Sequence, residues 1–277
     1  MRYLSLLWLS ALPLLAKPMV INDSKLLSAL QTGVGEFSED DSIPKAEDLK
    51  EAVGKAPRSV AVKVKSSSAT GADPADAVYM VGGVYKCGNC DKWHVGGVAT
   101  AWALGSDGLM VTNHHVLEGA KGGAIGVCDR KGNTYPVMEV LAADEVADMA
   151  LFRVRAEGLT TVSLAEPAGI GTEVQVISHP HRRFFMHTFG EVSRYYLRPG
   201  RKNQRESTWM SITADYAKGS SGGPVLNADG QVVGMVASTQ SIYYESNDGK
   251  PKGPLQMVVK NCVPVSSIAS MIKPVED

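Results

Sequence analysis

Short segments that alternate apolar and polar residues recur along most of this chain, and tight turns separate them. Residues 59–65, for example, alternate valine with polar residues in the two-residue period of a strand. Residues 105–108 and 227–230 have the Gly- and Asp-containing composition of turns that join hairpin strands. The chain also contains 28 glycines and few helical heptads. This pattern predicts an all-β fold, either a barrel or a sandwich.

The predicted strands fall into two sets of about six, separated by a linker-like segment at 164–171. The first set covers residues 59–65, 78–86, 95–104, 109–112, 124–128, 134–141 and 149–154. The second set covers residues 173–178, 187–196, 207–213, 224–226, 231–239 and 255–260. A short amphipathic helix is expected over 266–272. We therefore expect two similar β halves, at about 58–160 and 161–277.

The near-neutral charge gives no sign of a nucleic-acid or membrane-surface partner. The 277 residues include 28 basic and 29 acidic side chains, which leaves a formal net charge of −1. Hydrophobic residues make up 44% of the chain, which is enough to bury a core. We expect no nucleic-acid partner and no stable membrane span.

The N-terminus has the features of an export signal. Arg2 is followed by the apolar segment 3–15, and Ala16 offers a cleavage site, which predicts a signal peptide over 1–16. The apolar segment is short for a transmembrane helix, so a periplasmic or secreted protein is expected, with an uncleaved anchor as the alternative. Residues 17–57 are acidic, and we expect an extension outside the main core with short helices at 24–30 and 46–53.

Four cysteines occur in the chain, at positions 87, 90, 128 and 262. An even number in an exported protein favours disulfides, and Cys87 and Cys90 could close a local one. The same pair with His94 could be half of a zinc site, although no second C-x-x-C completes it. A redox pair is a third alternative, disfavoured because no βαβ pattern follows. The partners of Cys128 and Cys262 remain open, and we expect neither a cofactor nor a metal.

Three short segments carry candidate chemistry. Ser221 lies in a glycine-rich loop before Pro224, where the chain can turn sharply and aim backbone N–H groups at a substrate carbonyl. His115 follows a predicted strand, and Asp148 precedes another. Each alone has an ordinary explanation, as a loop, a surface histidine or a turn cap. Together, in the order His, Asp, Ser, they supply the base, the orienting acid and the nucleophile of a catalytic triad.

The three segments resemble those of trypsin-like serine endopeptidases of the bacterial HtrA/Deg type. The matching segments are 112–116, 148–151 and 219–224, with further matches at 190–193 and 231–236. The last strand and closing helix of the family match residues 254–272, and the resemblance covers about residues 78–272. It implies a protease domain over 58–277, built from two perpendicular six-stranded antiparallel β-barrels with a short C-terminal helix and an active site between the barrels.

The resemblance also implies roles for individual residues. Ser221 would be the nucleophile, His115 the general base and Asp148 the acid that orients the imidazole. The backbone N–H groups of Gly219 and Ser221 would form the oxyanion hole. His114 is expected to point away and is given no catalytic role.

Residues that would contact the substrate are predicted by the same comparison. Asp215 lies six residues before Ser221, where trypsin places the acid that selects basic side chains; the alternative is a local hydrogen bond. Ala237, Ser238 and Thr239 are expected to pair with the substrate backbone.

Several features differ from relatives or suggest regulation. Ser220 stands where digestive relatives carry Asp, so we expect no activation by an N-terminal ion pair. The chain ends at Asp277, so a following PDZ domain is not expected. Trimers are common in the family, so a homo-oligomer is kept as an alternative to a monomer, although no feature of the sequence fixes a trimer. A basic loop near the active site is either a solvated hairpin or a docking site for an acidic partner; its residues are Arg198, Arg201, Lys202 and Arg205.

We therefore expect an exported serine endopeptidase that cleaves polypeptides through an acyl-enzyme. The alternative is a catalytically silent, protease-like binding or chaperone module.

Overall fold

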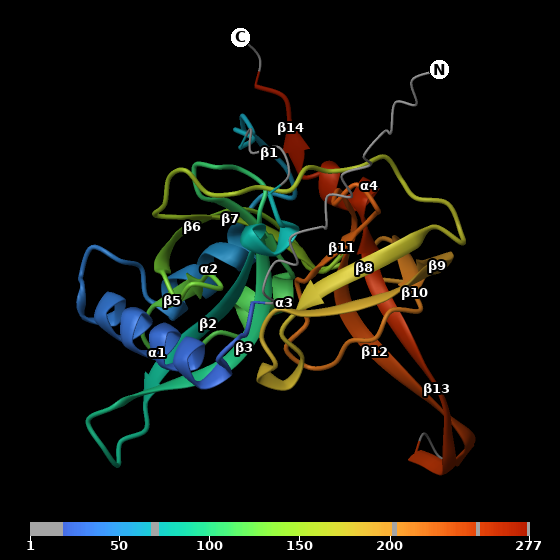
Figure 1. Cartoon of the computed structure of the whole chain (residues 1–277), viewed down its shortest axis with the longest axis horizontal. Helices are drawn as coiled ribbons and strands as arrows, with labels where there is room; N and C mark the ends of the chain where they lie inside the picture. Colours follow the sequence, from blue (N-terminus) through green and yellow to red (C-terminus); the bar gives the residue numbers. More distant parts are fainter. Residues whose placement is uncertain (1–18, 68–71, 201–203, 248–249, 276–277) are drawn as a thin grey trace, which may run out of the picture.

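The predicted strands close into two antiparallel barrels of six strands each (Figure 1). The structure is a computed structural model that describes residues 19–67, 72–200, 204–247 and 250–275. The first barrel has the order β2-β3-β4-β7-β6-β5, and the second has the order β10-β13-β12-β11-β8-β9. The prediction of an all-β, trypsin-like double barrel is confirmed.

Both barrels are built from consecutive strands joined by short connections. The first contains β2 (Val78–Lys86), β3 (Trp93–Ala103), β4 (Leu109–Thr112), β5 (Ile125–Cys128), β6 (Thr134–Asp144) and β7 (Met149–Val154). The second contains β8 (Glu173–Ser178), β9 (Met186–Arg198), β10 (Ser207–Ile212), β11 (Pro224–Leu226), β12 (Val232–Asn247) and β13 (Lys250–Pro264). The remaining elements are α1 (Asp23–Glu39), α2 (Ala46–Lys55), β1 (Val60–Ala61), η1 (Pro74–Ala77), α3 (His114–Glu118), η2 (Pro180–Arg182), α4 (Val265–Ala269) and β14 (Ile272–Lys273).

The two barrels pack directly against each other. One cluster of buried apolar side chains contains Trp102 and Leu151 of the first barrel together with Trp209 and Met235 of the second. Burial of this much apolar surface is the main favourable contribution to folding. The shared core therefore fixes the faces of the barrels that meet.

The prediction that residues 59–65 form a strand of the first barrel is wrong. Only β1 is extended there, and it pairs in parallel with β14, where Val60 faces Ile272. The predicted helix over 266–272 is also too long, because α4 ends at Ala269 and β14 follows. This pairing joins segments more than two hundred residues apart, so local alternation could not reveal it.

The expectation that residues 17–57 lie outside the core is wrong for the apolar faces of both helices. Leu26, Leu30 and Val34 of α1 are buried in the cluster that the barrels share. The helix lies close to β6 at Gly33, because a Cβ atom at this position would clash with Thr134 Oγ1. Likewise, α2 buries three apolar side chains beside the first barrel: Ala46, Leu49 and Val53. The predicted helix over 24–30 is thus a segment of a longer, docked helix.

No helix among the described residues is long and apolar enough to cross a membrane. The predicted signal peptide over 1–16 lies outside the described residues.

The packing of α1 gives a test of the shared core. Replacing Leu30, which is fully buried, with alanine removes apolar contacts and leaves a cavity, so we expect a loss of about 2–5 kcal/mol in the free energy of unfolding. Urea denaturation measures this loss. Thr32→Ala, at an exposed position of the same helix, is the control and should change stability little. Equal stability of the two variants would contradict the docking of α1.

Candidate active site

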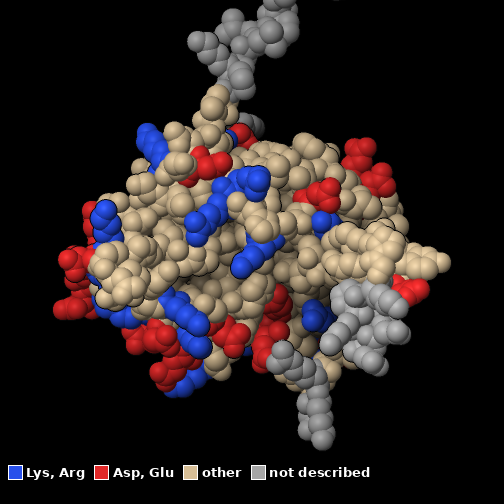
Figure 2. All heavy atoms as spheres, turned by 90° about the horizontal axis from the view of Figure 1, so that it is seen from below, with Lys and Arg blue, Asp and Glu red and all other residues tan. Residues whose placement is uncertain are grey.

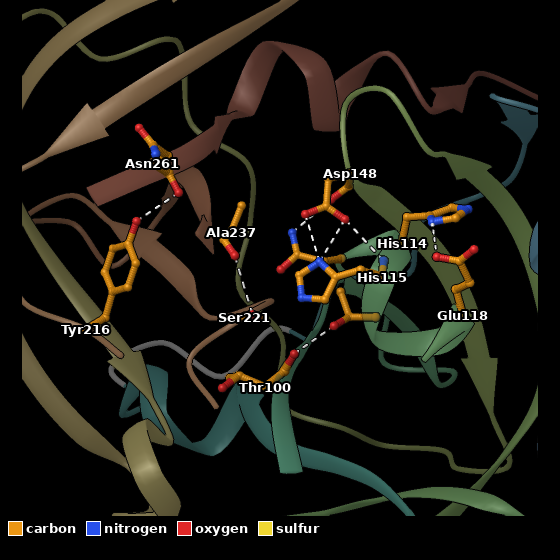
Figure 3. A network of polar contacts seen from close by, with 11 residues as sticks. Thr100, His114, His115, Glu118, Asp148, Tyr216, Ser221, Ala237 and Asn261 are labelled. Carbon is orange, nitrogen blue, oxygen red and sulfur yellow. Dashed lines mark hydrogen bonds and ion pairs between the residues drawn. The ribbon is translucent and has the colours of Figure 1, made fainter. Parts of the chain in front are cut away.

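The structure brings His115 and Asp148 together at the edge of the first barrel (Figure 3). His115 lies on α3, directly after the buried strand β4, and Asp148 directly precedes β7. His115 Nδ1 lies 2.9 Å from both carboxylate oxygens of Asp148, and the backbone N–H of His115 donates to Asp148 Oδ1 at 3.1 Å. The carboxylate therefore fixes the orientation of the imidazole and favours a proton on Nδ1.

Asp148 is held in an unusual backbone conformation. Its φ is 56°, a region that residues other than glycine seldom adopt. The side-chain amide of Asn113 donates to the Asp148 carbonyl at 2.8 Å, and Asp144 Oδ1 accepts from Val146 N and Ala147 N in the same turn. Such strain persists only where surrounding contacts impose it.

The second barrel also contacts this turn, because Arg205 forms an ion pair with the buried carboxylate of Asp144. Sequence reasoning missed Asn113 and Asp144, and their residue types alone gave no signal of these contacts.

The electrostatic environment of His115 has two opposing effects. Burial disfavours the imidazolium and by itself would lower the pKa of His115. The hydrogen bond that His115 donates to Asp148, the negative charge of Asp148 and the charge of Glu118 outweigh burial and raise the pKa of His115 above its usual value of 6.5. Asp148 therefore stabilises the cation that a general base becomes when it accepts a proton.

His114 points away from this pair, as expected, and its ring lies 3.8 Å from Glu118 (Figure 3).

The loop that carries Ser221 belongs to the second barrel but is hydrogen-bonded to the first. Thr100 of β3 donates its N–H to Ser221 O at 2.8 Å and its hydroxyl to Gly219 O at 3.0 Å. Gly219 has a φ of +100°, and a Cβ atom there would lie 2.4 Å from His179 O. A Cβ atom at Gly222 would lie 2.0 Å from Thr100 O. Only glycine fits at these two positions.

Ser221 lines the same cavity as His115, but the two side chains are not hydrogen-bonded. The Ser221 hydroxyl instead faces the carbonyl oxygen of Ala237 at 3.4 Å (Figure 3). Among the described residues, the backbone N–H groups of Gly219 and Ser221 donate no hydrogen bond. These two donors therefore have no hydrogen-bond partner within the part of the chain that the structure describes.

Two buried side chains support the loop from beneath. Ser220 is fully buried, and its hydroxyl accepts a hydrogen bond from Ser178 at 2.9 Å. His179 is also fully buried, and its Nδ1 accepts the Phe185 N–H at 3.0 Å. Burial lowers the pKa of His179 to about 4. The loop thus rests on neutral polar groups; the sequence analysis singled out Ser220 but not His179.

Cavities open on both sides of His115. One of about 610 Å³ is lined by Asp148, Trp209, Ala237 and Ser238 as well as His115. The other, of about 570 Å³, is lined by His115 and Ser221 together with the wall formed by β2 and β3; its residues there include Tyr85, Val98 and Ala99. A larger cavity of about 780 Å³ lies on the wall of the second barrel and contains none of the predicted site residues.

Of the predicted substrate-contacting residues, Ala237 and Ser238 line the cavity near His115, whereas Thr239 does not. Asp215 lies elsewhere: its side chain is 87% exposed and forms an ion pair with Lys260 at 3.1 Å. The buried Tyr216 hydroxyl donates to Asn261 O at 2.8 Å and also lies 3.0 Å from Ser238 O. The structure thus gives the Asp215 side chain a partner within the chain, Lys260 of β13.

Two basic residues near the site, Arg198 and Arg205, lie among the described residues, and both contact other residues of the chain. The guanidinium of Arg198 lies 4.6 Å from the centre of the Trp209 ring, and Arg205 contacts Asp144. Arg201 and Lys202 lie outside the described residues. On the face shown in Figure 2, acidic and basic side chains lie close together.

No disulfide joins any of the four cysteines, all of which lie among the described residues. Cys128 and Cys262 are buried in β5 and β13, in different barrels. Cys87 Sγ and Cys90 Sγ lie 3.5 Å apart, well beyond a disulfide bond of about 2.05 Å. A disulfide between them stays a prediction.

The pKa of His115 depends on its neighbouring carboxylates. In Asp148→Asn the negative charge is removed while burial remains, so we expect the pKa of His115 to fall below its wild-type value. A pH titration of the imidazole ring protons by NMR measures this pKa. Glu118→Gln is the matched comparison and should lower the pKa less, because the Glu118 charge has the smallest effect. An unchanged pKa in Asp148→Asn would contradict the pairing.

Buried, neutral His179 makes stability depend on pH. Its folded pKa of about 4 lies below the unfolded value near 6.5. As the pH falls, the unfolded chain therefore binds a proton at His179 before the folded chain does. The contribution of His179 to the free energy of unfolding is complete above pH 6.5 and is lost as the pH falls towards 4. The loss amounts to about 3 kcal/mol. Urea denaturation at several pH values should show a smaller loss for His179→Asn, which keeps an acceptor for Phe185 N. Equal losses would contradict this account.

Comparison with known proteins identifies the domain. A family profile described as a trypsin-like peptidase domain matches residues 99–235. The magnetosome formation protease MamE of Paramagnetospirillum magneticum is 30% identical over 191 residues, which are 64% of this chain and 25% of that protein. The serine endoprotease DegS of Haemophilus influenzae is 26% identical over 160 residues, which are 57% of this chain and 46% of that protein.

A probable periplasmic serine endoprotease, DegP-like, from Hahella chejuensis is 31% identical over 140 residues, covering 49% of this chain and 28% of that protein. The chain thus spans less than half the length of these three relatives. The predicted resemblance is confirmed: residues 99–235 match a trypsin-like peptidase domain, and the chain is related to the serine endoprotease DegS, to a DegP-like endoprotease and to the protease MamE.

Proposed function

We propose that this chain is a serine endopeptidase that hydrolyses polypeptides through an acyl-enzyme. The observation that carries the proposal is the placement of the Asp148–His115 pair and Ser221 around one cleft, with the free N–H groups of Gly219 and Ser221 beside the serine. Base, orienting acid, nucleophile and anion-binding donors are the groups that acyl transfer requires.

The reaction begins with a rotation of the Ser221 side chain from Ala237 O towards His115 Nε2. His115 takes the hydroxyl proton as Ser221 Oγ forms a bond to the peptide carbonyl carbon. The oxygen that becomes negative accepts hydrogen bonds from Gly219 N and Ser221 N, a contribution of about 3 kcal/mol for one such donor. The imidazolium, stabilised by Asp148, then protonates the leaving amine as the C–N bond breaks. Water then attacks the acyl carbon and gives a proton to His115. The bond between that carbon and Ser221 Oγ breaks, His115 returns the proton to Ser221, and the carboxylic acid leaves.

The open edge of β12 supports an extended polypeptide as substrate. β11 pairs with β12 only as far as Met235, whereas β13 continues to pair along the other edge. From Ala237 onwards one edge of β12 therefore faces no strand among the described residues. A substrate segment can add to this edge by backbone hydrogen bonds, next to Ser221.

Export is part of the proposal. The predicted signal peptide over 1–16 and the relative described as a periplasmic endoprotease both support a periplasmic or secreted location.

The second candidate is a catalytically silent module that binds polypeptides. It is favoured by one observation, the orientation of the Ser221 hydroxyl towards Ala237 instead of His115. In structures without substrate, however, catalytic hydrogen bonds are often long and form only in the reacting complex.

A fluorophosphonate probe and an unfolded protein substrate together test the proposal. The wild type should be labelled and should cleave the substrate, whereas Ser221→Ala should lose labelling and at least about 10³-fold in kcat/KM. Ser266→Ala, an exposed serine of α4, is the control and should behave as the wild type. Absence of both labelling and cleavage in the wild type would overturn the proposal and favour the silent module.

A further inference from the structure

Three potential metal ligands meet at the tip of the β2–β3 hairpin, which projects away from the first barrel (Figure 1). The ligand atoms of Cys87, Cys90 and His94 all lie within 4.8 Å of one another. The two sulfurs are 3.5 Å apart, and Cys90 Sγ lies 3.1 Å from His94 Nε2. The proposed hydrolytic mechanism uses none of these residues.

The hairpin itself creates this cluster. Tyr85 pairs with His94 and Lys86 with Trp93, so the register places the imidazole beside the start of the Cys87–Cys90 turn. Gly88 has a φ of +77°, which lets the turn close and bring both thiols to one side. Lys86 stabilises the turn, because its ammonium group donates a hydrogen bond to Asp91 O at 2.8 Å. The ligands are thus held by a closed hairpin.

The donor set selects the class of metal. Two thiols and one imidazole suit a borderline or soft cation, whereas Ca²⁺ and Mg²⁺ require oxygen ligands. Zn–S bonds of about 2.3 Å and Zn–N bonds of about 2.0 Å imply tetrahedral S···S and S···N separations of about 3.8 and 3.5 Å. The observed separations are a few tenths of an ångström shorter. Small side-chain rotations at this exposed tip would bring the three atoms to those positions.

We propose that Cys87, Cys90 and His94 form a three-ligand site for a thiophilic divalent cation such as Zn²⁺, with the fourth position open to water or an external ligand. Binding releases the thiol protons, and no electron transfer is involved. A Cys87–Cys90 disulfide would use the same sulfurs, so oxidation and metal binding exclude each other. The site lies on the hairpin whose residues Tyr85 and Val98 line the cleft beside Ser221.

Titration of the reduced protein with Co²⁺, under anaerobic conditions and after removal of the reductant, tests the site. We expect one equivalent to bind with a thiolate-to-cobalt charge-transfer absorption, and Zn²⁺ to displace it. Cys90→Ser should lose this absorption, and His94→Gln should bind more weakly with a shifted spectrum. His181→Gln, which removes another exposed histidine, is the control and should titrate as the wild type.

Thiol reactivity provides a second readout that does not depend on spectra. Cys87 and Cys90 are exposed whereas Cys128 and Cys262 are buried, so two thiols of the folded, reduced protein should react rapidly with a disulfide reagent. One equivalent of Zn²⁺ should slow both. The proposal would be overturned if the reduced wild type bound no equimolar Co²⁺, if Cys90→Ser bound it equally well, or if Zn²⁺ left both reaction rates unchanged. Every readout is independent of peptidase activity.

Discussion

The hydrogen bonds from Thr100 to the Ser221 loop join the two halves of the proposed site. Ser221 belongs to the second barrel, whereas His115 and Asp148 belong to the first. Thr100 lies on β3 of the first barrel and binds the loop at Ser221 O and Gly219 O, while its own carbonyl accepts the Thr112 hydroxyl at 2.8 Å. These bonds are short and partly or wholly buried, so a displacement of one barrel would leave polar groups unpaired. The barrels therefore keep one relative position, which positions the nucleophile against its base.

Strain on each side of this junction is balanced by contacts across it. Asp148, Gly219 and Gly222 have positive φ values, and each is held by backbone or side-chain hydrogen bonds. The ion pair between Arg205 and Asp144 connects the second barrel to the turn that carries Asp148. The free energy gained in the shared core offsets the cost of these conformations.

Elements added to the barrels shape the surroundings of the site. α1 packs on the first barrel beside β2 and β3. The contact is close at Gly35, because a Cβ atom there would lie only 2.6 Å from Trp93 of β3. The same two strands form one wall of the cleft and carry the cysteine cluster at their tip. A ligand at the tip would therefore act on a hairpin that also borders the substrate.

Local sequence was sufficient to predict two sets of strands and to mark the residues proposed for catalysis, whereas the two six-stranded barrels were expected from the family resemblance. Strand alternation and turn composition depend on neighbouring residues, and the segments around His115, Asp148 and Ser221 each carry their motif within a few positions. Contacts between distant segments decided the rest. The β1–β14 pair, the burial of α1, the Lys260 partner of Asp215 and the Thr100 junction each join residues far apart in the chain. Periodicity carries no information about such pairs, because burial and hydrogen bonding between them exist only once the chain has folded.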